Sequence, residues 1–361
     1  MAELTRRHCI QGTLAALAGA GVGPASPVLA ASPKTNKGGM KLAEIFGSPR
    51  SRDIKLAKQI GINHVIAGPG LGRVRRELYV ETLQKLKDDF AEAGMTIAGV
   101  ESHPVPAERI KLGVEGRDEE IENYKWAIEA LSKVGIKMIC YNFMAGLGWS
   151  RTRVNVPERG GALTSEFDLE AANKQGPTRW GEVSEEKMWD NLTYFVKAVM
   201  PVADKFGVRM ALHPDDPPIS PLRGIGRIVI SAKAYRRVMD MAPSPINGVT
   251  FCQANFKLMG EDIYSLAKEW CSKKKIFFVH FRDVEGTKAK FHETFHDNGP
   301  TNMVRMLQIY SKGGFNGPIR PDHAPTIEGE ANDRPGYAMG GKVLAIGYMK
   351  GIMDALKLPY E

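Results

Sequence analysis

The feature that most constrains this chain is an alternation, after residue 40, of short apolar runs with longer amphipathic segments. Eight runs have strand character, at 41–47, 63–68, 95–102, 136–143, 208–214, 248–253, 276–282 and 317–323. The segments between them carry apolar residues at helical spacing, and a last one, 341–356, follows the eighth run. Eight strand–helix units predict an α/β fold, a single (β/α)8 TIM barrel over residues 41–361.

One stretch interrupts this rhythm. Residues 144–183, after the fourth run, are polar and rich in glycine, and we expect them to form a long loop. Loops of this length in compact domains commonly act as lids or binding loops.

The first forty residues have a different character. Arg6 and Arg7 precede a weakly apolar, Ala- and Gly-rich stretch that ends at the small-residue site Val28-Leu29-Ala30. This pattern predicts a twin-arginine signal peptide over residues 1–30 and a linker over 31–40. The twin-arginine export machinery is then a partner, and the mature protein is periplasmic. The sequence contains no run of about 18 apolar residues, so we expect no integral membrane segment after cleavage.

Charge and cysteine content narrow the classes of partner. The formal net charge is +8, but the basic residues are spread along amphipathic segments without aromatic interleaving. Solvated helix faces therefore explain the charge better than a nucleic-acid surface. Three cysteines remain after the predicted cleavage, and an odd number argues against a disulfide scaffold. A small anionic substrate and a homo-oligomer are both compatible with the sequence.

Four consecutive runs end in a residue that can bind a metal. His213 ends the fifth run, Cys252 the sixth, His280 the seventh and Asp322 the eighth. In a parallel barrel the active site lies at the carboxyl ends of the strands, and consecutive strands are neighbours. Each residue alone is more often structural, but four matching placements predict a divalent metal site. Thiolate and imidazole ligands favour zinc or iron, and the residues do not choose the ion.

Other polar residues near these strand ends could contact a substrate. Arg282 and Arg320 each carry the guanidinium fork that suits a carboxylate. His296 belongs to the segment HETFHDNG (292–299), which either supplies substrate contacts or forms a polar turn.

Several motifs in order along the chain resemble the mannonate dehydratase family. They are ESHPVP, RDEEIENYKWAIEALSKVGIKMICYNFM, HPDDPP, HFRDVEGTKAKFHETFHDNG and RPDH. The resemblance runs from about residue 40 to the C-terminus. It implies a metal-dependent lyase, on a xylose isomerase-like TIM barrel, that converts D-mannonate to 2-keto-3-deoxy-D-gluconate, usually with Mn2+.

The resemblance also assigns roles to individual residues. It places the metal on His213, Cys252, His280 and Asp322, the same residues that the strand ends indicate. A catalytic histidine directly after the ligand aspartate corresponds to His323. A catalytic tyrosine in a Gly-rich stretch downstream corresponds to Tyr337 in RPGYAMGG; the sequence does not say which of these two is the base.

The sequence departs from the family pattern in three places. Ala254 and Asn255 follow Cys252 where a small-residue turn is usual. The loop around AGLGWSRT lacks acidic and aromatic residues before the tryptophan. The export signal is unusual for sugar-acid catabolism.

Three alternative functions remain open. A xylose isomerase-like isomerase or epimerase would rely more on Glu and Asp ligands, an exported sugar-acid binding protein would not need the acid–base pair, and a DNA-repair nuclease would need more ligands.

Overall fold

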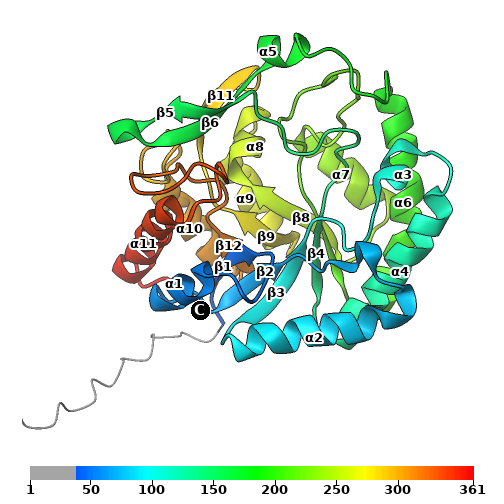
Figure 1. The fold of residues 1–361 in the computed structure, drawn as a ribbon, viewed down its shortest axis with the longest axis horizontal. Coiled ribbons are helices and arrows are strands. Elements are labelled where there is room, and N and C mark those ends of the chain that lie inside the picture. Colours follow the sequence, from blue (N-terminus) through cyan, green and yellow to red (C-terminus); the bar gives the residue numbers. More distant parts are fainter. Residues whose placement is uncertain (1–37) are drawn as a thin grey trace, which may run out of the picture. The chain divides into compact units, whose positions relative to one another are not determined.

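The predicted barrel is present in a computed structural model that describes residues 38–361. Eight parallel strands close in the order β1-β12-β9-β8-β7-β4-β3-β2 (Figure 1). These strands are β1 (Lys41–Phe46), β2 (His64–Ala67), β3 (Thr96–Glu101), β4 (Met138–Tyr141), β7 (Arg209–Leu212), β8 (Asn247–Cys252), β9 (Ile276–His280) and β12 (Pro318–Arg320). The predicted signal peptide and residues 31–37 of the predicted linker lie outside the described residues.

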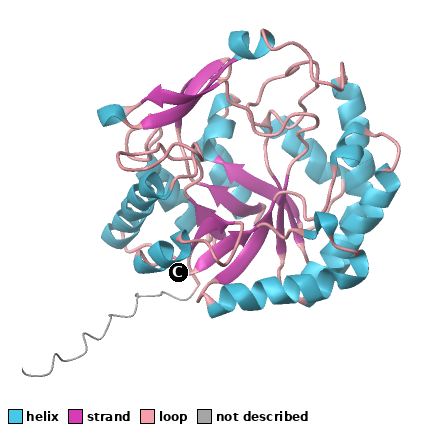
Figure 2. Ribbon diagram, viewed as in Figure 1, coloured by secondary structure: helices cyan, strands magenta, loops and turns pink. Residues whose placement is uncertain are grey.

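Helices form a layer around the barrel strands (Figure 2). They are α1 (Asp53–Gln59), α2 (Tyr79–Glu92), α3 (Glu108–Leu112), α4 (Arg117–Lys133), α6 (Glu185–Phe206), α7 (Ala232–Met241), α8 (Gln253–Leu258), α9 (Ile263–Ser272), α10 (Met303–Lys312) and α11 (Met339–Ala355). Within residues 38–361, none of the helices combines the length and the apolarity that a membrane crossing requires.

The core divides into two layers because successive strand residues point to opposite faces. Leu42 on β1 belongs to the large cluster between the strands and the helices, whereas its neighbour Ala43 belongs to a separate cluster with Ile66, Met138 and Phe278. This second cluster fills the barrel interior, as in TIM barrels generally. The packed interior leaves the carboxyl ends of the strands as the place for a site.

The stretch 144–183, predicted as a loop, contains regular structure. It holds β5 (Arg153–Pro157), β6 (Leu163–Asp168) and the short helix α5 (Leu169–Asn173). These strands join β10 (Val284–Thr287) and β11 (Lys290–Glu293) in an antiparallel sheet of order β10-β11-β6-β5, apart from the barrel (Figure 1). The loop prediction was wrong because the pairing partner of β6 lies far along the chain. In addition, β5 (RVNVP) is short and largely exposed, so its alternation of polar and apolar residues does not mark a buried strand.

A buried ion pair ties the first strand to the last helix, and it leads to a stability prediction. Glu44 on β1 and Lys342 on α11 are 0% and 1% exposed, and Nζ lies 2.5 Å from Oε1. Replacing Lys342 by methionine leaves the carboxylate buried without its cation. We expect the free energy of unfolding to fall by about 3–5 kcal/mol, measured by urea denaturation.

The double variant Glu44→Met/Lys342→Met is the control for this prediction. Because it removes both charges, it should recover most of the lost free energy of unfolding. A loss in the single variant of under about 1 kcal/mol, the size expected for an exposed pair, would contradict the prediction.

Candidate active site

A cavity of about 640 Å3 opens at the carboxyl ends of the barrel strands. Residues at or just after strand ends line it, among them Glu101, Asn142, His213, His280 and His323. This volume lies in the range of small-molecule sites. Position and size therefore agree with a substrate site where TIM barrels usually have one.

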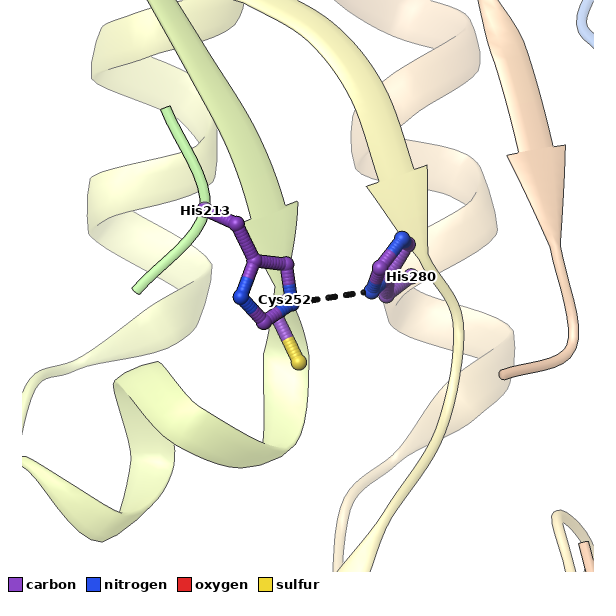
Figure 3. A group of neighbouring side chains, drawn as sticks. All are labelled: His213, Cys252 and His280. Atoms are coloured by element: carbon purple, nitrogen blue, oxygen red, sulfur yellow. Dashed lines mark hydrogen bonds between the residues drawn. The ribbon is translucent and has the colours of Figure 1, made fainter. Parts of the chain in front are cut away.

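Three of the four predicted metal ligands meet in this region. Cys252 and His280 are direct partners in the register of β8 and β9, and His213 follows the last residue of β7. One ligand atom from each of the three lies within 4.8 Å of the other two. Figure 3 shows the side chains turned toward one another, with Nε2 of His213 3.1 Å from Nδ1 of His280.

The charges around this cluster favour a bound cation. Burial raises the pKa of Cys252, but Arg282 and hydrogen bonds with His213 and His280 outweigh it and lower the pKa to about 6. The thiolate is the form that binds metals. Burial lowers the pKa of His280, yet Asp322 outweighs this effect and raises the pKa to about 10. A divalent cation would replace the proton between the two imidazoles, so the donor set fits a divalent metal ion.

Asp322, the fourth predicted ligand, lies beside this cluster and contacts two arginines. Its Oδ2 is 3.4 Å from Nδ1 of His280 and 2.8 Å from Nε of Arg282, and its Oδ1 is 2.7 Å from Nη2 of Arg320. Because a carboxylate offers about four lone-pair sites, these contacts leave room for a metal bond. Burial would raise the pKa of Asp322, but Arg320 and His323 keep it well below its usual value.

The predicted substrate contacts do not reach the cavity directly. Arg282 and Arg320 are fully buried and are absent from the described residues that line the cavity. Both contact Asp322, so they hold this carboxylate in place. His296 is buried and stacks on Phe281 with ring centroids 6.3 Å apart, also away from the cavity lining. Burial lowers the pKa of His296 to about 4, which keeps this side chain neutral.

The predicted acid–base pair is joined by a hydrogen bond. His323 follows Asp322 after β12, and its Nε2 lies 3.0 Å from Oη of Tyr337. Its Nδ1 lies 3.1 Å from Oε1 of Glu293. Burial raises the pKa of Glu293, but Arg282 and Arg151 outweigh it and lower the pKa to about 2. An ionised Glu293 only accepts, so Nδ1 of His323 donates to it, and in the neutral form of this imidazole Nε2 accepts from the tyrosine hydroxyl.

Tyr337 keeps its proton at neutral pH, because burial and the negative charge of Asp322 raise its pKa. The backbone before it approaches His323 closely. Gly336 has φ +81, and a Cβ there would lie 3.3 Å from ring and Cβ atoms of His323. Glycine at this position lets the Gly-rich stretch bring Tyr337 to the imidazole.

The stretch 144–183, which was predicted to be a lid or a binding loop, contributes residues to the cavity lining. Trp149 lines the cavity, and its ring centroid lies 4.8 Å from that of His323. The side chain of Arg151 is fully buried and contacts both Asp216 and Glu293. These contacts connect the stretch to the carboxylate that orients His323.

Two residues of the site were missed by sequence reasoning. Glu293 was noted only as a member of a polar segment, although it is the last residue of β11, the kind of position that the strand-end argument uses. Asp216 is the second aspartate of the motif HPDDPP, and it contacts Arg151 and Arg282. Burial raises its pKa, but these two arginines outweigh it and keep the pKa below its usual value. The motif HPDDPP could have indicated this second carboxylate.

Comparison with known proteins connects this geometry to a family. The model of the D-mannonate dehydratase (UxuA) family matches residues 44–180 and 172–360. The chain belongs to the D-mannonate dehydratase family. Mannonate dehydratase 2 of Halalkalibacterium halodurans is 36% identical over 342 residues, which cover 86% of this chain and 97% of that protein. As a family member, the chain is an enzyme of the hydro-lyase class.

Solved structures agree with this UxuA-family assignment. The crystal structure of mannonate dehydratase from Streptococcus suis serotype 2 matches with a TM-score of 0.78 and 30% identity, covering 88% of this chain and 93% of that one. The structure of the IOLI protein with a bound zinc atom matches with a TM-score of 0.54 at 15% identity, over 89% of this chain and 100% of that one. The second likeness concerns the fold alone.

Proposed function

We propose that this UxuA-family enzyme removes water from D-mannonate to give 2-keto-3-deoxy-D-gluconate. The observation that carries the proposal is the hydrogen-bonded pair of His323 and Tyr337 beside the cluster of His213, Cys252 and His280. Dehydration of a 2,3-dihydroxy acid needs both parts, because the C2 proton is weakly acidic and hydroxide is a poor leaving group.

We propose that His213, Cys252, His280 and Asp322 hold a divalent ion, with Mn2+ favoured by the family resemblance and Fe2+ or Zn2+ as the alternatives. A divalent cation at this position supplies positive charge that stabilises the negative charge developing at the carboxylate end of the substrate. In this proposal Arg282 and Arg320 act by holding Asp322, which both of them contact.

The hydrogen bonds of His323 support a division of roles within the pair. Its Nδ1 donates to Glu293, so Nε2 carries the lone pair. When the Tyr337 hydroxyl turns its proton from Nε2 to the C3 hydroxyl of the substrate, this lone pair is free to take the proton from C2. As the C2–H bond breaks, a double bond forms between C2 and C3, and the C3 hydroxyl leaves with a proton from Tyr337. The imidazolium then returns a proton to the tyrosine oxygen across their 3.0 Å hydrogen bond. The enol at C2 tautomerises to the ketone, and one water is lost in total.

Metal analysis combined with a product assay tests this function. The purified mature chain should contain a divalent metal and form 2-keto-3-deoxy-D-gluconate from D-mannonate, and chelation should abolish turnover. Metal without product would sink the proposed reaction and favour another sugar acid or an isomerase. If no metal is bound after reconstitution with manganese, zinc and iron, the ligand assignment fails.

We further propose that the chain is exported to the periplasm through its twin-arginine segment. Support comes from Arg6, Arg7 and the small-residue site at Ala30. Replacing both arginines by lysine is expected to retain most of the protein in the cytoplasm at full length. Cell fractionation and the mass of the purified chain measure both effects. Equal periplasmic amounts for the variant and the wild type would contradict the prediction.

A further inference from the structure

One buried lysine that lines the cavity lacks a carboxylate partner. Lys111 on α3 is 8% exposed, and its Nζ donates to Oδ1 of Asn142 at 3.2 Å and to the carbonyl of Met144 at 3.4 Å. The other buried lysine and arginine side chains in residues 38–361 each contact a carboxylate: Arg151 with Asp216, Arg227 with Asp215, Arg282 with Asp216, Arg320 with Glu101 and Lys342 with Glu44. Lys111 has no such contact within the described range.

Burying the charged ammonium of Lys111 costs free energy unless it has a further hydrogen-bond partner. Burial is the main cause that lowers the pKa of Lys111, to about 8. An ammonium has three donors, and the protein occupies two of them. Because a methionine would fill the same volume without a buried charge, packing alone does not explain a lysine at a cavity wall.

An acceptor lies on the same wall. Nε2 of His103 is 2.8 Å from the carbonyl of Asn142, so Nε2 donates and Nδ1 is left as an acceptor. In the described part of the chain, this buried Nδ1 has no hydrogen-bond partner. Burial and the nearby Lys111 keep the pKa of His103 well below its usual value, so this ring stays neutral. Both side chains contact Asn142, and a donor and an acceptor on one wall match hydroxyl groups, which both accept and donate.

The order of the strands places this wall opposite the reacting groups. In the closed ring, β3 lies four strands from β9, and β4 lies four strands from β12. His103 and Lys111 follow β3, whereas His280 ends β9 and His323 follows β12, and all four line one cavity. A sugar acid whose carboxylate end lies at His280 and His323 therefore extends toward Lys111.

We propose that Lys111, with His103, binds hydroxyl groups at the end of the sugar acid remote from the carboxylate, and so selects acids with a six-carbon chain. Lys111 is a substrate-binding residue in this proposal, and the inference rests on the proposed function for the orientation of the substrate. It adds a specificity determinant on the side of the barrel away from the acid–base pair.

Binding measurements on two acids of different length test the inference. We would titrate the metal-loaded wild type and Lys111→Met with D-mannonate and with a four-carbon 2,3-dihydroxy acid of the same configuration at C2 and C3. Lys111→Met should weaken D-mannonate binding about tenfold or more, the effect of a hydrogen bond to a charged group. The four-carbon acid lacks C5 and C6, so its Kd should change less than about twofold.

The matched control is Lys85→Met on the exposed face of α2, which should change neither Kd. If Lys111→Met weakens the binding of both acids equally, Lys111 has a structural role and the inference is overturned. An unchanged Kd for D-mannonate in Lys111→Met, or a wild type that does not bind D-mannonate, would also overturn it. If Lys111→Met does not fold, Lys111→Gln should show the same difference between the acids. Turnover is measured separately: a wild type that binds D-mannonate without forming the keto acid would overturn the proposed function alone.

Discussion

Glutamine in place of His323 is expected to lower kcat for D-mannonate by about 10^3-fold or more, because general acid–base groups typically contribute 10^2–10^4-fold. Glutamine can still hydrogen-bond to Glu293 and Tyr337, the two partners of His323. It cannot take a proton, so both the removal of the C2 proton and the return of a proton to Tyr337 are lost. The metal content should remain that of the wild type.

The controls for this prediction separate chemistry from structure. His292→Gln alters a neighbouring histidine on β11, whose Nε2 lies 3.6 Å from Glu158 and which is absent from the described cavity lining. This variant should keep wild-type turnover. A kcat for His323→Gln within tenfold of the wild type would remove His323 from the mechanism, and a parallel loss of metal would assign it to the metal site instead.

The part of the site that follows from strand ends could be predicted because barrel geometry is regular. Cys252 and His280 end neighbouring parallel strands, and the register pairs them directly. His213 and Asp322 each lie within two residues of a strand end. Position along the chain therefore determines position around the barrel, and chemical type identifies the ligands among the strand-end residues.

Contacts that depend on long-range pairing could not be predicted in the same way. Glu293 reaches His323 because β11 pairs with β6, more than a hundred residues earlier, and β5 is too short and too exposed to indicate this sheet. Arg282 has the chemistry of a substrate ligand, but its surroundings turn it inward. Lys111 lies on a short helix, where a lysine gives no sign of burial before the fold is known.

Arg282 connects the two halves of the site through its contacts. It contacts Asp322 on the ligand side and Glu293 on the acid–base side, and it is the main positive influence that lowers the pKa of Cys252. A guanidinium keeps its charge at any physiological pH, so it can hold the carboxylates of Asp216, Glu293 and Asp322 in fixed positions. The ligand set and the orientation of His323 are therefore coupled through one buried side chain.

Alanine in place of Cys252 is expected to weaken divalent-metal binding by more than about 100-fold, beyond the 10–100-fold typical for groups that only orient a ligand. The reason is that Cys252 is the one thiolate among the three residues whose ligand atoms lie within 4.8 Å of one another. Competition with a chelator of known affinity measures the change, and keto-acid formation should fall in parallel.

Two further cysteine variants decide how this result is interpreted. Cys271 on α9 packs in the core outside the barrel, so Cys271→Ala should keep metal affinity and serves as the matched control. Cys140 lies with Glu101 and His280 in a second group whose ligand atoms also converge. Burial raises the pKa of Cys140 well above its usual value, so this thiol stays protonated and is a poor ligand. A larger loss of affinity in Cys140→Ala than in Cys252→Ala would place the metal on this second group, with His280 as the shared ligand.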